Sequence, residues 1–270
     1  MIFFREGLRE KLKAVTKDNY YIVADFNRTF TKSETPSSWS AISKSGTLGA
    51  GYVEDRQALF EKYRPYEIDL TLDEKIKSRY MTEWWEQHVA LFVKHKATKN
   101  IFELVGSDNN LFQYRRGARE FLELMHHRSA PVLIVSAGVG DIIENSMRHN
   151  GMLFTNIEIV SNFMAYRGGV VCGLNGGAIH SLNKDEACPT GGFKKMIASK
   201  SDVFVLGDSI DDIKAVPERE RERAIKIGFC EANNKESLPA FREAFNITCT
   251  DNTSFEELLK ALEENTDFTF

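Results

Sequence analysis

Short runs of apolar residues alternate with amphipathic segments along most of the chain. We expect strands at the apolar runs, which occupy residues 20–24, 131–135, 157–160, 203–206, 224–227 and 246–249. We expect helices where apolar residues recur every three or four positions, at residues 117–127, 141–150, 192–199 and 238–245 and from Ser254 onward. Continuous apolar strands that alternate with helices are typical of a parallel sheet covered on both faces. The pattern therefore predicts an α/β fold.

One long segment, residues 37–107, interrupts this alternation. It contains no convincing buried strand, and residues 54–63 and 72–98 have the apolar spacing of helices. A helical insertion after the first strand predicts a cap that covers the edge of the sheet. We therefore expect a core domain formed by residues 1–36 and 108–270, a helical cap domain formed by 37–107, and a substrate between them.

Two neighbouring tryptophans, Trp84 and Trp85, lie in the second of these predicted helices. Consecutive residues of a helix point in different directions. We therefore expect one indole to lie in the core of the cap and the other to face the cleft.

Composition narrows the class of protein. The chain has 270 residues, and its 35 basic and 39 acidic residues give a formal net charge of −4 without a dense basic block. Nucleic-acid and anionic-membrane partners are therefore not expected. The four cysteines form no CxxC pair, and no apolar stretch approaches the roughly 18 residues that a membrane span needs. We expect a monomeric cytoplasmic protein with free thiols.

Polar residues suited to binding or catalysis follow three of the predicted strands. Asp25 follows the strand 20–24, Ser136 follows 131–135, and Asp208 and Asp212 follow 203–206. In open α/β sheets, ligands bind at the carboxyl ends of the strands. A carboxylate there can attack phosphorus, a hydroxyl followed by small residues can hold phosphate oxygens, and clustered carboxylates suit Mg²⁺. Taken singly, Asp25 and Asp208 could equally cap a turn or a helix.

Glycine-rich nucleotide loops are not apparent. Gly173–Gly177 is not followed by the Lys-Ser/Thr pair of a phosphate loop, and we expect it to form a hairpin turn. No G-x-G-x-x-G follows Val23 or Val135, which disfavours a dinucleotide-dependent oxidoreductase.

Together these residues resemble the four ordered motifs of haloacid-dehalogenase (HAD) superfamily phosphatases. The motifs are Asp25-x-Asn27-x-Thr29, Ser136, Lys184 and Gly207-Asp-Ser-x-x-Asp212. Residues from about 60 to 230 resemble the cytosolic 5′-nucleotidase III, or pyrimidine 5′-nucleotidase, family more closely. This likeness lies in Tyr66–Asp69, Tyr80–Trp85, Ser136–Asp141, Ser161–Met164 and Asn183-Lys184. The resemblance implies a Rossmann-like core with a cap and a Mg²⁺-dependent 5′-nucleotidase that acts on nucleoside monophosphates, pyrimidine ones in particular.

The resemblance also implies roles for individual residues. Asp25 would be the nucleophile, forming an aspartyl-phosphate, and would also be a Mg²⁺ ligand. The backbone carbonyl of Asn27 and the Asp208 carboxylate would be further ligands, supported by Asp212. Phosphate would be held by Ser136 and the Ala137 backbone and steadied by Lys184. In the cap, Glu67 would hydrogen-bond the nucleobase and Trp85 would face it, while His88 stands where the family has a serine near the substrate.

Asn27 departs from the family pattern. The family carries an aspartate there, which protonates the leaving oxygen and then activates water. An amide has no titratable proton, and general acid–base catalysis is worth roughly 10²–10⁴-fold, or about 3–5 kcal/mol of barrier. The sequence is therefore compatible with a slow phosphatase, with an enzyme that uses water or another side chain instead, and with a nucleotide-binding or regulatory protein that lacks turnover.

Overall fold

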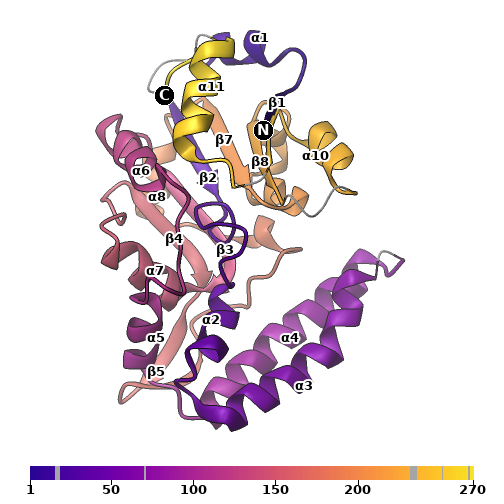
Figure 1. Ribbon diagram of the computed structural model, residues 1–270, viewed down its shortest axis with the longest axis vertical. Helices are drawn as coiled ribbons and strands as arrows, with labels where there is room; N and C mark the ends of the chain where they lie inside the picture. Colours follow the sequence, from indigo (N-terminus) through magenta and orange to yellow (C-terminus); the bar gives the residue numbers. More distant parts are fainter. Residues whose placement is uncertain (16–18, 70, 232–235, 251, 267) are drawn as a thin grey trace.

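The computed structural model describes residues 1–15, 19–69, 71–231, 236–250, 252–266 and 268–270. Its described residues form a seven-stranded sheet in the order β1-β9-β8-β7-β2-β3-β4 (Figure 1). In that order the strands are Ile2–Phe4, Ile247–Thr250, Ile225–Cys230, Asp202–Gly207, Tyr20–Ala24, Val132–Val139 and Ile157–Asn162. All neighbouring strands pair in parallel except β1, which is antiparallel to β9. The predicted α/β class and the predicted strands are confirmed.

Side chains that alternate along the central strands define two apolar layers. In β2, Ile22 and Ala24 face one layer, whereas Tyr21 and Val23 face the other. The first layer is covered by α1 (Leu8–Lys13), α6 (Ala118–His127), α7 (Gly140–His149) and α11 (Phe255–Thr266). The second is covered by α8 (Gly191–Ile197), by η2 (Ile210–Ala215), and by Val216 and Ala224, which flank the short helix α9 (Glu218–Arg221). Against β8 packs α10 (Leu238–Ala244).

A separate hairpin, β5 (Met164–Arg167) and β6 (Val170–Leu174), follows β4. Its turn lies at Gly168 and Gly169, whose φ angles of 59° and 80° suit residues without a Cβ. The predicted hairpin turn at Gly173–Gly177 is therefore wrong, because Gly173 lies inside β6 and pairs with Ala165.

The segment between β2 and β3 is helical, as predicted. Before α6, it forms α2 (Ser38–Ser45), α3 (Gly49–Ile68), α4 (Glu74–Lys94) and α5 (Lys99–Gly106). The long pair α3–α4 stands apart from the sheet, whereas α5 lies beside α7 (Figure 1). At that contact a Cβ on Gly106 would lie 2.8 Å from Asn145 Cβ. Within the described part of the chain, none of the helices combines the length and apolar character that crossing a membrane requires.

Candidate active site

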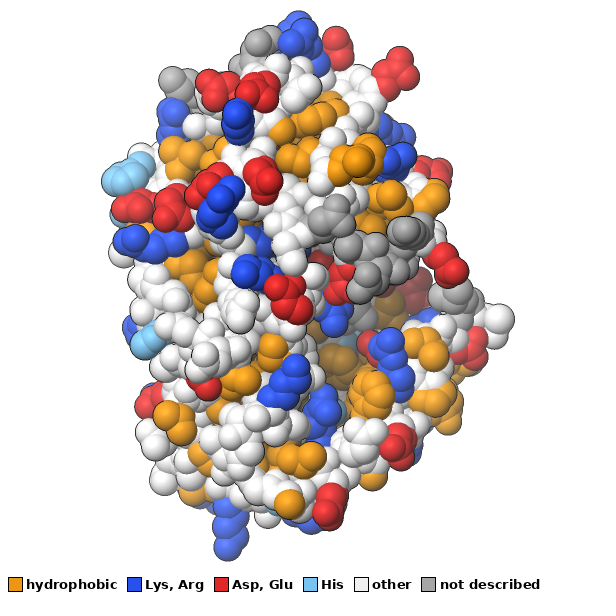
Figure 2. Space-filling view, viewed as in Figure 1, with side chains coloured by type: hydrophobic (Ala, Val, Ile, Leu, Met, Phe, Trp, Pro, Cys, Tyr) orange, Lys and Arg blue, Asp and Glu red, His pale blue; other side chains and the backbone are white. Residues whose placement is uncertain are grey.

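A cavity of about 460 Å³ lies between the carboxyl ends of the central strands and the cap helices. The surface is hollowed at this place, between the sheet and the pair α3–α4 (Figure 2). Asp25, Ser136 and Asp208 line its floor, because β2, β3 and β7 are neighbours in the sheet and end at the same edge. The structure thus brings together the residues that the sequence places at the ends of these strands.

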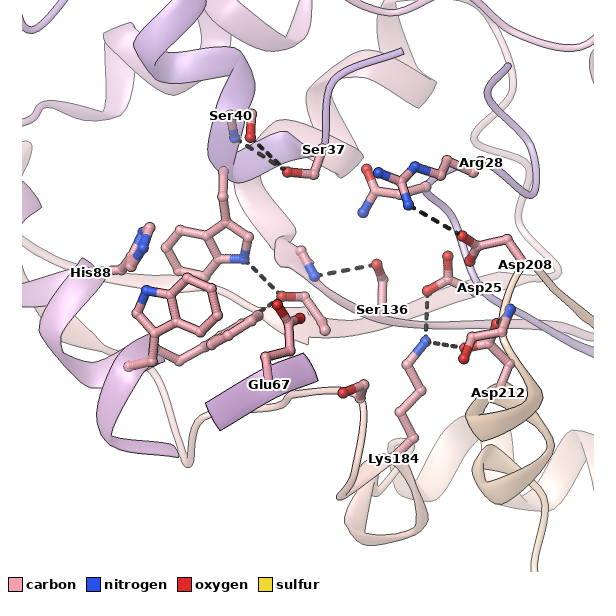
Figure 3. Close-up of a pocket in the computed structure, with 18 of the residues that line it drawn as sticks. Asp25, Arg28, Ser37, Ser40, Glu67, His88, Ser136, Lys184, Asp208 and Asp212 are labelled. Carbon is pink, nitrogen blue, oxygen red and sulfur yellow. Dashed lines mark hydrogen bonds and ion pairs between the residues drawn. The ribbon is translucent and has the colours of Figure 1, made fainter. Parts of the chain in front are cut away.

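Lys184 connects the acidic residues of the floor. It begins the short helix η1 (Lys184–Glu186), and its buried Nζ donates hydrogen bonds to Asp25 Oδ1 at 2.6 Å and Asp212 Oδ1 at 2.7 Å (Figure 3). The second oxygen of Asp212 accepts from the backbone N–H of Ser209 at 2.9 Å. Both Asp212 oxygens therefore have protein donors. A Cβ on Gly207 would overlap this carboxylate, which explains the glycine there.

Burial and mutual repulsion shift the pKa values of these groups. Burial raises the pKa of Asp25 to about 6, opposed by the Lys184 ammonium and reinforced by the Asp212 carboxylate. Burial, followed by repulsion from Asp212 and Asp25, raises the pKa of Asp208 well above its usual value. Burial alone would lower the pKa of Lys184, but the two carboxylates outweigh it and raise this pKa. The floor therefore has an excess of negative charge that a further cation would relieve.

The donor set fits a hard divalent cation. Asp25 and Asp208 supply carboxylate oxygens, and the Arg28 guanidinium near Asp208 lies 3.9 Å from its Oδ2. Among the described residues, no three His, Cys, Asp or Glu side chains are grouped closely enough to form a metal cage of their own. Mg²⁺ does not need such a cage, since it binds through one or two carboxylates and keeps waters and substrate phosphate oxygens as its other ligands.

Asn27 lies between the floor and the first cap helix. Its Oδ1 accepts from the backbone N–H of Ser38 at 3.3 Å, and Ser38 Oγ accepts from the backbone N–H of Val139 at 2.8 Å. Next to them, the buried Ser136 Oγ accepts from the backbone N–H of Gly138 at 3.3 Å. A Cβ on Gly138 would meet Ser38 Oγ at 2.5 Å, so the irregular carboxyl end of β3 requires glycine at this position. Asn27 therefore lies in a hydrogen-bonded cluster that joins the start of α2 to the carboxyl end of β3.

Two cap helices are tied to the same part of β3 by indole hydrogen bonds. Trp39 Nε1 of α2 and Trp85 Nε1 of α4 both donate to the Ala137 carbonyl at 2.8 Å. Trp84 packs instead with Tyr63 and Met81 in a small core of the cap, although its indole also lines the cavity. The two neighbouring indoles have different partners, but the expectation that only one of them faces the cleft is wrong, because both line the cavity.

The remaining predicted substrate residues lie in the cap wall of the cavity. Glu67 forms an ion pair with Arg64 one turn earlier in α3. His88 is buried against Trp39 and Trp84, at ring-centroid distances of 5.1 and 5.9 Å. Burial, with a smaller effect of the Arg56 charge, lowers the pKa of His88 to about 3, so its ring is neutral near pH 7.

Among the cavity residues that sequence reasoning missed are Arg28, Trp39, Arg56 and Arg64. Arg28 follows Asn27 directly, has a left-handed φ of 59°, and pairs through Nε with Glu231 Oε1 at 3.1 Å. Its position beside the first motif was the one available signal. The others lie in helices whose packing brings them to the cavity, and no motif distinguishes them.

Comparison with known proteins connects this site to one family. Residues 25–264 match the family model described as Pyrimidine 5′-nucleotidase (UMPH-1). The 7-methylguanosine phosphate-specific 5′-nucleotidase of Homo sapiens is 31% identical over 241 residues, which cover 85% of this chain and 79% of that protein. The Drosophila melanogaster protein of the same name is 28% identical over 246 residues, covering 87% and 76%.

Comparison with solved structures points to the same family. Cytosolic 5′-nucleotidase IIIB bound to cytidine superposes with a TM-score of 0.83 at 25% identity, covering 97% of this chain and 94% of that one. A phosphoserine phosphatase, solved as an analogue of its phospho-aspartyl intermediate, superposes with a TM-score of 0.57 at 18% identity, covering 91% and 99%. At that identity the second likeness concerns the fold alone.

Proposed function

Because the chain belongs to the pyrimidine 5′-nucleotidase (UMPH-1) family, we propose that it hydrolyses nucleoside 5′-monophosphates, pyrimidine ones in particular, with Mg²⁺. The observation that carries this proposal is the contact between Asp25 and Lys184 at the floor of a cavity closed by aromatic cap residues. A buried carboxylate held by an ammonium at a strand end is suited to nucleophilic attack on phosphorus.

The reaction proceeds in two displacements. An Asp25 oxygen attacks phosphorus, the bond from phosphorus to the nucleoside O5′ breaks, and the leaving oxygen takes a proton from water. Water then attacks the aspartyl-phosphate, which releases inorganic phosphate and restores the Asp25 carboxylate. Lys184 neutralises charge next to the attacking oxygen, and the Ser136 hydroxyl with the backbone N–H groups after it holds the phosphate oxygens.

Asp25, Asp208 and the Asn27 carbonyl would hold Mg²⁺, which supplies charge neutralisation at the phosphoryl oxygens. Asp212 acts through Lys184 and the Ser209 backbone, since both of its oxygens have protein donors. In the cap, Glu67, Trp85 and His88 lie where they can contact the base.

Asn27 motivates a second candidate, a nucleotide-binding protein without turnover. The amide is hydrogen-bonded to the Ser38 backbone and has no proton to give to the leaving oxygen. The fold and the binding surfaces would be kept in such a protein, while the acid–base step would be lost.

Phosphate release from UMP, CMP and 7-methylguanosine monophosphate, measured with and without Mg²⁺, tests the proposal. We expect Mg²⁺-dependent release from at least one nucleotide, and a gain of roughly 10²–10⁴-fold in kcat for Asn27→Asp. Asn110→Asp adds the same charge at an exposed, distant position and should leave kcat unchanged. No release by either the wild type or Asn27→Asp, with UMP binding intact, would favour the binding protein.

A further inference from the structure

A buried guanidinium supports the loop that follows Asp25. Arg115 lies between α5 and α6 and is only 5% exposed. Its Nη2 donates to the Arg28 carbonyl at 2.7 Å, its Nε to the Thr29 carbonyl at 3.0 Å, and its Nη1 to the Thr253 carbonyl at 3.1 Å. Among the described residues, no carboxylate forms an ion pair with Arg115. The charged fork is therefore used on neutral backbone acceptors, two of which are consecutive residues of this loop.

The guanidinium is itself held rigidly. It is planar, with its donors in fixed directions, and its Cζ lies 4.5 Å from the centroid of the Phe229 ring. The backbone N–H of Arg115 donates to the Phe30 carbonyl at 2.8 Å, and the preceding residue, Tyr114, forms an antiparallel bridge with Thr31. Main-chain and side-chain contacts thus fix Arg115 against the same loop.

The loop contains a backbone conformation that needs such support. Arg28 has a left-handed φ of 59°, which residues with a Cβ seldom adopt. Its backbone N–H donates to Thr31 Oγ1 at 2.8 Å, and its carbonyl accepts from Arg115. The N–H of Arg28 belongs to the same planar peptide group as the carbonyl of Asn27. Thr31 and Arg115 therefore hold the peptide groups on the two sides of Arg28, and this fixes how the Asn27 carbonyl is oriented in the loop.

We infer that Arg115 is a positioning residue for the metal site: it keeps Arg28 in its left-handed conformation and thereby orients the Asn27 carbonyl, the backbone ligand that we propose for Mg²⁺. Arg115 is not among the residues that line the cavity, so it acts only through the loop. The inference rests on the proposed function, because it takes the floor of the cavity to bind a hard divalent cation.

The positive charge of Arg115 makes the expected result distinctive. The guanidinium is permanently charged and is hydrogen-bonded to the residue that follows Asn27. Removal of this charge would by itself strengthen the binding of a cation at the acidic floor. Removal of a positioning group weakens that binding instead. A role confined to stability leaves the metal affinity of the folded protein unchanged.

Mn²⁺ binding to the nucleotide-free protein tests the inference without turnover. Mn²⁺ takes the same oxygen ligands as Mg²⁺, and the electron paramagnetic resonance signal of the free ion measures how much is bound. We expect Arg115→Met to weaken binding roughly 10–100-fold, as the loss of groups that orient metal ligands commonly does. Calorimetric titration with Mg²⁺ is the second readout.

Two further variants separate position from charge. Arg115→Lys keeps the charge but lacks the planar fork, and we expect it to weaken binding as well; it replaces Arg115→Met if circular dichroism shows that the latter is unfolded. Arg242→Met removes a guanidinium that lies 3.5 Å from the centroid of the Phe3 ring, in α10 and outside the cavity wall. It should keep the wild-type affinity.

Three results would overturn the inference: no Mn²⁺ binding by the wild type, unchanged or tighter binding by the folded Arg115 variants, or an equal loss of affinity in Arg242→Met. The phosphate-release experiment separates this outcome from failure of the proposed function. Mg²⁺-dependent release with unchanged metal affinity in the Arg115 variants contradicts the inference alone. Weakened metal binding in these variants, without release by the wild type or Asn27→Asp, contradicts the hydrolase alone.

Discussion

Lys184 is a buried cation whose two partners are both buried carboxylates, Asp25 and Asp212. The transfer of these charges from water is costly, and the close hydrogen bonds offset that cost. Removal of the ammonium leaves like charges facing each other in a poorly solvated site. The residue therefore holds the floor of the cavity together, in addition to the chemical role that we propose for it.

We predict that Lys184→Met destabilises the metal-free protein by about 3–5 kcal/mol, because it leaves uncompensated buried charges. The double variant Lys184→Met/Asp212→Asn should be more stable than the sum of the single effects implies, since one of those charges is then absent. Urea unfolding at pH 7 in the presence of EDTA measures both. Lys260→Met breaks an exposed ion pair with Glu264 and should not shift the unfolding midpoint measurably. Strict additivity of the two single changes would contradict the coupling.

At the scale of elements, the Ala137 carbonyl joins the cap to the core. It accepts from Trp39 of α2, from Trp85 of α4 and from Asn162 Nδ2 of β4, the last at 3.0 Å. The carboxyl end of β3 is thus held by two cap helices and one neighbouring strand.

Trp85→Phe removes one of these donors while keeping an aromatic ring. We expect the ligand-free protein to lose about 1 kcal/mol more stability than in Trp84→Phe, because Trp84 Nε1 has no partner to lose among the described residues. Chemical unfolding of both variants measures the difference. Equal losses would mean that the indole hydrogen bond to Ala137 contributes nothing to cap docking.

How well the sequence predicts a strand or a turn depends on its burial, its length and its glycine content. Central strands such as β2 and β7 are buried on both faces and show as continuous apolar runs. The edge strand β1 has only three residues, too few for a recognisable pattern. The hairpin turn was misplaced because Gly173–Gly177 has more glycine than the actual turn at Gly168 and Gly169.

In the active site, too, the sequence predicts some residues and not others. Asp25 and Asp208 directly follow β2 and β7, and Ser136 lies in the carboxyl-terminal half of β3, so the topology of a parallel sheet predicts that they meet. Lys184 needed the family resemblance, since it is one of 35 basic residues and lies in no strand or long helix. Arg56 reaches the cavity only through the packing of α3, a contact that apolar spacing does not encode. The domain boundaries at residues 37 and 107 and the individual catalytic roles stay predictions.

At the scale of the whole molecule, His180 links the core to the cap and makes this link sensitive to pH. Its Nδ1 accepts from the Leu182 backbone N–H at 3.2 Å, and its Nε2 lies 3.1 Å from Thr82 Oγ1 of α4. The acceptor role of Nδ1 requires the neutral ring, and burial lowers the pKa of His180 to about 4. In the unfolded chain the same ring takes up a proton near pH 6.5.

Between pH 6.5 and 4 the unfolded state therefore binds more protons at His180 than the folded state does. Stability from this residue is fully present above pH 6.5 and is lost as the pH falls toward 4, at up to about 1.4 kcal/mol per pH unit. We expect the free energy of unfolding of the wild type to decline more steeply over this range than that of His180→Gln, which cannot titrate. Urea unfolding of both proteins from pH 7.5 to 4.5 measures the difference, and the other titrating groups, His88 included, cancel in the comparison. Parallel curves would show that His180 is protonated in the folded protein at the same pH as in the unfolded chain, and that the contact between core and cap does not depend on its neutral form.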